Sequence, residues 1–104
     1  MSDPAIPAAN PARGEVMIAG YRLRPSFAAL VAAEGELGPL FALVERAADG
    51  QLTLAESVAL FWHCLDPSPE NLTREGFGDA VSAAGLAAMS GALRILLGQI
   101  LRGG

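Results

Sequence analysis

The stretch at residues 13–37 reads RGEVMIAGYRLRPSFAALVAAEGEL, and its hydrophobic pattern changes period once. The first half is β-like, with Val, Ile, Tyr and Leu spaced around its centre; Tyr21 and Leu23 would point to one face of a strand, and Arg22 and Arg24 to the other. Ala19 and Gly20 separate two such segments, and Gly20 can supply the positive φ that closes a tight hairpin, for example after a type I turn. Pro25 ends the second segment, because proline has no N–H to donate to a strand ladder. The stretch predicts a β-hairpin over residues 15–24.

The second half of this stretch has a helical period, with Phe27, Leu30 and Val31 at positions i, i+3 and i+4. This spacing predicts a helix over residues 26–35. Glu34 falls next on the same apolar side, and a carboxylate that is buried there needs a partner. An arginine of the hairpin is the obvious candidate, so a structural salt bridge is favoured over a catalytic carboxylate.

The remainder of the chain should provide helical cover, because a two-stranded hairpin is only marginally stable in water by itself. Helical periodicity and breaks at Gly, Pro and Asp predict further helices over residues 39–48, 54–65, 74–84 and 86–101. The best-defined helix start is the capping box at Thr53-Leu54-Ala55-Glu56. The predicted fold class is mainly α (α+β): an N-terminal β-hairpin packed on a bundle of four or five short helices.

One composition shift, after residue 12, sets the expected organisation. Residues 1–12 contain three prolines and few large apolar side chains, so they are predicted to form a flexible, dispensable arm. Residues 13–104 are predicted to form a single domain. No apolar run marks a signal peptide, and the most apolar segment, residues 85–101, is too short and too polar to span a bilayer. We therefore expect a cytoplasmic protein without a membrane partner.

The charge and the small side chains exclude several classes of protein. The formal net charge is −4, and the seven basic residues are all arginines scattered along the chain, which argues against a nucleic-acid partner bound through phosphates. Hydrophobic residues make up 52% of the chain, but twenty of them are Ala, so the core must be built largely of small side chains. A single cysteine, Cys64, rules out an internal disulfide.

No set of residues predicts catalysis or cofactor binding. His63 and Cys64 are adjacent, so on a helix their side chains point about 100° apart. The chain has no second His or Cys for a metal site, and Cys64 lacks a partner base and an orienting group. The glycines form no phosphate-binding loop. We expect no enzyme activity, no metal and no cofactor.

Two surfaces are candidates for binding a partner. The last helix has an apolar arc wider than one stripe, so it is either central in the bundle or covers a partner. The hairpin has a free edge that could pair with another chain, with two arginines beside it. The predicted partner-binding residues are Leu93, Leu97, Ile100, Leu101, Arg22 and Arg24.

Several blocks of the chain, in their order and spacing, resemble one known family. The blocks are RGEV and the hairpin, LRPSFAALVAAEGELG, LFALVERAADGQLTLAESVALFWHCL and LTREGFGDAVSAAGL. Over residues 10–101 they resemble the small tail-assembly-chaperone family of gene transfer agents and siphophage-like tails, also described as a tail tube protein family. The resemblance implies a non-catalytic chaperone that binds the tape-measure protein, with the tail tube protein as a further candidate partner and a homo-oligomer as a further option. The alternative is a structural subunit of the tail tube.

Overall fold

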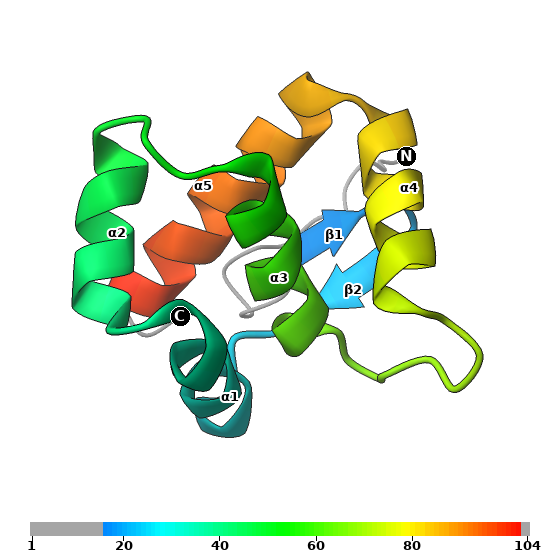
Figure 1. The fold of residues 1–104 in the computed structure, drawn as a ribbon, viewed down its shortest axis with the longest axis horizontal. Coiled ribbons are helices and arrows are strands. Elements are labelled where there is room, and N and C mark those ends of the chain that lie inside the picture. The colour runs from blue at the N-terminus through cyan, green and yellow to red at the C-terminus, as the bar shows by residue number, and fades with distance from the viewer. Residues whose placement is uncertain (1–15, 103–104) are drawn as a thin grey trace, which may run out of the picture.

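One hairpin and five helices make up residues 16–102, the part of the chain that the computed structural model describes (Figure 1). The elements are β1 (Val16–Ile18), β2 (Tyr21–Leu23), α1 (Phe27–Leu37), α2 (Leu40–Ala48), α3 (Leu54–Cys64), α4 (Arg74–Ala84) and α5 (Leu86–Arg102). The predicted fold class is therefore confirmed, and each predicted helix end lies within two residues of the observed one. The arm predicted over residues 1–12 lies outside the described residues.

The hairpin closes through a two-residue turn. β1 and β2 are antiparallel, with Ile18 opposite Tyr21. Gly20 has the expected positive φ of 83°, but Ala19 is also left-handed, with a φ of 54°. Positive φ at both central residues is the signature of a type I′ turn, which matches the twist of the flanking strands, so the suggested type I turn is wrong.

The hairpin is buried on one face and held at the edge of β2. Val16, Ile18 and Leu23 are buried, whereas Met17 and Arg22 are exposed; Leu23 and Arg22 thus lie on opposite faces, as predicted. The chain leaving α3 runs beside β2 and pairs with it through one isolated antiparallel bridge, between Leu23 and Leu65. The Arg24 N–H donates to the Cys64 carbonyl at 2.7 Å, and the Asp66 N–H donates to the Arg22 carbonyl at 3.0 Å. The outer edge of β2 is thus already occupied.

α3 forms the centre of the domain. The capping box at its start is present as predicted, with Thr53 Oγ1 accepting from the Glu56 N–H at 3.1 Å and Glu56 Oε1 accepting from the Thr53 N–H at 3.0 Å. Its middle residues 57–61 are all buried, and α1 and α4 both pack against it (Figure 1). The largest fully buried side chains of the core are Phe61, Phe77, Leu23, Leu43, Leu60 and Leu96.

α1 packs on α3 through its alanines. Ala33 is the one fully buried residue of α1, and Ala29 is half-buried, whereas Phe27 and Val31 are exposed. Small side chains at a helix contact let the two axes approach closely. Of the apolar side predicted for this helix, Phe27 and Val31 therefore face solvent, Leu30 is half-buried against the core, and Glu34 is exposed.

A sharp corner joins α1 to α2. Gly38 has a φ of 90°, a conformation that favours glycine, and the two helices are bent by 79° across this break. Among the described residues no single helix is long and apolar enough to cross a membrane. Two bent pairs, α1 with α2 and α4 with α5 (108°), would suffice on length and composition alone.

Candidate functional site: an apolar groove between three helices

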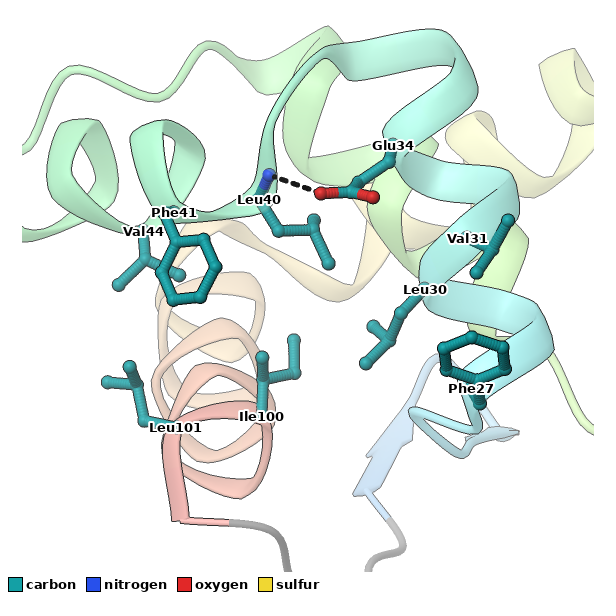
Figure 2. A pocket seen from close by; sticks show the side chains of 9 residues that line it. All are labelled: Phe27, Leu30, Val31, Glu34, Leu40, Phe41, Val44, Ile100 and Leu101. Atoms are coloured by element: carbon teal, nitrogen blue, oxygen red, sulfur yellow. Dashed lines mark hydrogen bonds between the residues drawn. The ribbon is translucent and has the colours of Figure 1, made fainter.

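An open apolar groove lies between α1, α2 and the C-terminal end of α5, with a volume of about 400 Å³ (Figure 2). Eight of its nine lining residues are apolar, and the ninth is a glutamate. The lining consists of Phe27, Leu30, Val31, Glu34, Leu40, Phe41, Val44, Ile100 and Leu101. We call it the α1–α2–α5 groove.

Large side chains in this groove stand in solvent rather than in a core. Phe27 is 84% exposed, Phe41 86% and Leu101 65%. Figure 2 shows these side chains on three different helices around an open middle. Burying one such side chain contributes about 1.5–3 kcal/mol. A contiguous set of them is typical of a surface that another molecule covers.

Glu34 closes the groove at the corner between α1 and α2. Its Oε2 accepts a hydrogen bond from the backbone N–H of Leu40 at 3.1 Å (Figure 2). Leu40 is the first residue of α2, and Pro39 before it provides no side-chain cap. The carboxylate therefore caps α2 from the neighbouring helix, where the helix dipole favours a negative charge.

The predicted ion pair between Glu34 and a hairpin arginine is wrong. Both candidate arginines lie beside Asp66 instead. Arg22 Nε donates to the Asp66 carbonyl at 3.1 Å, and Arg24 Nη1 lies 3.9 Å from Asp66 Oδ2. The reason is the pairing of β2 with the chain after α3, which brings Asp66 next to the exposed face of the hairpin.

α2, which forms one wall of the groove, is also fixed to α3 by an ion pair. Arg46 Nη2 lies 2.9 Å from Glu56 Oε2, and Arg46 Nη1 donates to Glu56 Oε1 at 2.9 Å. The Arg46 hydrogen bond, helped by the backbone of Thr53, lowers the pKa of Glu56 from 4.5 to about 2. Glu56 is thus shared between the cap of α3 and the anchor of α2.

The predicted partner-binding residues separate into three places. Ile100 and Leu101 line the groove. Leu93 and Leu97 lie half-buried against the core, outside that lining. Arg22 and Arg24 are exposed on the hairpin, whose β2 edge is already paired, and their role in partner binding stays a prediction.

Sequence reasoning missed the groove residues of α1 and α2. The signal was available for one of them: Phe41 lies off the buried stripe of its helix, where only Leu43 is fully buried. For Phe27 the helical period indicated an apolar side but could not indicate which side packs on α3.

His63 belongs to an ion cluster that joins three helices. Its Nε2 lies 2.7 Å from Glu36 Oε1, and Arg74 Nη1 donates to Glu36 Oε2 at 2.6 Å. Arg74 also lies over the Trp62 ring at 5.6 Å. The hydrogen bond from Arg74, followed by that with His63, lowers the pKa of Glu36 to about 2. The cluster connects α1, α3 and α4 from the solvent side.

Cys64 is buried, and burial raises the pKa of its thiol to about 12. A thiol with so high a pKa is a poor nucleophile at neutral pH. Within residues 16–102, no group of three or more His, Cys, Asp or Glu side chains is arranged to hold a metal ion.

The fold and the groove together define a small hairpin-and-helix domain that presents an open apolar groove to solvent. A family model described as "Phage tail tube protein, GTA-gp10" matches residues 14–103. The match covers most of the chain, so the protein belongs to this family of phage-type tail proteins. The resemblance seen in the sequence to a gene-transfer-agent and phage tail family is confirmed. No curated protein and no solved structure matches the chain.

Proposed function

We propose that this protein is a non-catalytic assembly chaperone that binds the tape-measure protein and keeps it soluble before the tail tube polymerises. The observation that carries the proposal is the α1–α2–α5 groove, with its exposed Phe27, Phe41 and Leu101. A chaperone of this kind needs an exposed apolar surface that binds segments of its client which would otherwise aggregate. The tape-measure protein is the client that the family resemblance implies.

The alternative, a structural subunit of the tail tube, is less well supported by the hairpin. Each of its strands has three residues, and the outer edge of β2 is occupied by Leu65. Closing a ring of subunits by strand pairing requires free and sufficiently long edges. Residues 16–102 contain no strands other than these two short ones. The small amount of β-structure therefore favours the chaperone over the tube subunit.

Co-expression with the tape-measure protein of the same tail gene cluster tests the proposal. We expect the wild-type chain to shift the tape-measure protein into the soluble fraction and to co-purify with it. The double variant Phe27→Asp, Phe41→Asp should lose both effects while circular dichroism shows an unchanged helical fold, because both side chains are exposed. Leu86→Asp is the control, since Leu86 is 70% exposed at the other end of α5.

Purified tails distinguish the two candidate functions. A chaperone should be absent from assembled tails, whereas a tube subunit should be present in many copies, which quantitative immunoblotting would show. Retention of a soluble tape-measure complex by the double variant would contradict the groove as the binding surface.

A further inference from the structure

The walls of the groove determine the conformation of whatever binds there. They come from three helices, α1, α2 and α5, which present side chains and no strand edge to the groove. An extended peptide in this groove would bury its N–H and C=O groups without partners, which is strongly unfavourable. A helix satisfies its own backbone and needs only an apolar face, as in other helix-in-groove complexes. The groove is therefore suited to a helix.

The charge in the groove determines a second property of its occupant. Glu34 is the one charged residue in the lining. Its Oε2 accepts from the Leu40 N–H, whereas Oε1 has no hydrogen-bond partner among the described residues. An apolar occupant would partly desolvate this carboxylate, so a cation beside it would be favoured. The net charge of −4 also favours a basic partner over a second copy of this chain.

We propose that the groove binds an amphipathic helix of the tape-measure protein in which a lysine or arginine beside the apolar stripe pairs with Glu34. This inference rests on the proposed function and adds the structure and the charge of the client segment. Large apolar residues at positions i, i+3 or i+4, and i+7 of that helix would contact Phe27, Phe41 and Leu101.

Peptides of about 20 residues that tile the tape-measure sequence provide the probe, with binding to the full chain followed by fluorescence anisotropy. The peptides that bind should be amphipathic, should carry a basic residue beside the apolar stripe, and should gain helicity on binding. Leu101→Ser should abolish binding. Leu86→Ser should not, because this leucine is equally exposed on the same helix but lies outside the groove.

Removal of the Glu34 charge tests the ion pair. In Glu34→Gln the amide oxygen still accepts from the Leu40 N–H, so the start of α2 is preserved while the charge is lost. We expect its affinity for the basic peptides to fall about tenfold or more, and the wild-type affinity to weaken with added salt. Glu45→Gln is the matched control, because Glu45 is exposed on α2 outside the groove. Its affinity should stay within about twofold of the wild type.

A charge swap gives the strongest form of the test. A peptide whose basic residue is replaced by Glu should lose affinity for the wild-type chain and regain it with Glu34→Lys. Equal affinity of Glu34→Gln and wild type, or binding without a gain in helicity, would overturn the inference and leave the proposed function standing. Failure of every peptide to bind, while the full tape-measure protein is still kept soluble, would do the same. If the chain neither binds peptides nor solubilises the tape-measure protein, both proposals fail.

A second copy of the chain is the competing occupant. Sedimentation of the chain alone should show a monomer at micromolar concentration. A dimer that dissociates in Phe41→Ser but not in Leu86→Ser would place a second copy in the groove and overturn the inference.

Discussion

Ala19 has the most unusual backbone conformation among the described residues, because it is left-handed without being glycine. An L-residue in this region is destabilised by about 1–2 kcal/mol. Ala19→Gly should therefore raise the free energy of unfolding by about 0.5–1 kcal/mol after the entropy of the added glycine is counted. Thermal unfolding should show a Tm higher by a few degrees, since about 1 kcal/mol corresponds to about 4–8 °C in a domain of this size.

The same substitution at an exposed helical alanine should act in the opposite direction. Ala32 lies in the middle of α1 and is exposed. Ala32→Gly should lower the free energy of unfolding by about 0.5–1 kcal/mol. If both variants were destabilised, the turn conformation assigned to Ala19 would be contradicted.

Gln99 is a buried polar residue on the core side of α5. Its Oε1 has no hydrogen-bond partner among the described residues. Leaving such a group buried and unpaired costs about 1–3 kcal/mol. Gln99→Met, of similar shape, should therefore raise the midpoint of urea unfolding, whereas Gln51→Met at an exposed position should leave it unchanged. A lower midpoint for Gln99→Met would show that the amide is satisfied in the folded protein.

At the scale of helices, the Glu36 cluster makes the attachment of α1 dependent on pH. The folded-state pKa of Glu36 is about 2, below its ordinary value of 4.5, chiefly because of the Arg74 hydrogen bond. A depressed pKa contributes stability that is complete above about pH 4.5 and is lost as the pH falls toward 2. The carboxylate is 40% exposed, so the contribution is modest.

Thermal unfolding as a function of pH checks this expectation. Glu36→Gln should lower the Tm at pH 7 and reduce the further fall of the Tm below pH 4.5. Glu70→Gln, on the exposed loop between α3 and α4, is the control and should follow the wild-type profile. A Glu36→Gln profile parallel to that of the wild type would contradict the assigned ion cluster.

α1 shows why part of the site could not be predicted from the sequence. Helix boundaries depend on local signals, such as the Thr53 cap, and these were predicted closely. The orientation of α1 depends on a choice between an alanine side and a Phe27–Val31 side, and both are apolar. Only tertiary packing decides that choice, so the groove was predicted at its α5 side and missed at α1 and α2.

At the scale of the whole molecule, the phenylalanines fall into two groups, those buried in the core and those exposed to solvent. Phe77 is fully buried, in edge-to-face contact with Tyr21 at 5.4 Å, whereas Phe27 is exposed. Phe77→Ala should cost about 3–5 kcal/mol and leave the chain largely unfolded at 37 °C. Phe27→Ala should change stability by less than about 0.5 kcal/mol. Chemical unfolding of both variants checks this, and a large loss in Phe27→Ala would mean that α1 is packed differently.

The bridge between Leu23 and Leu65 has a consequence for the order of folding during translation. The two residues belong to segments separated by α1, α2 and α3, so the ribosome completes the hairpin well before its edge partner is made. Until Leu65 emerges, the nascent chain exposes an open strand edge, which is the kind of surface that mispairs with other chains. Pairing of the outer edge of β2 is therefore a late, long-range event, although the hairpin itself is the most local element of the fold.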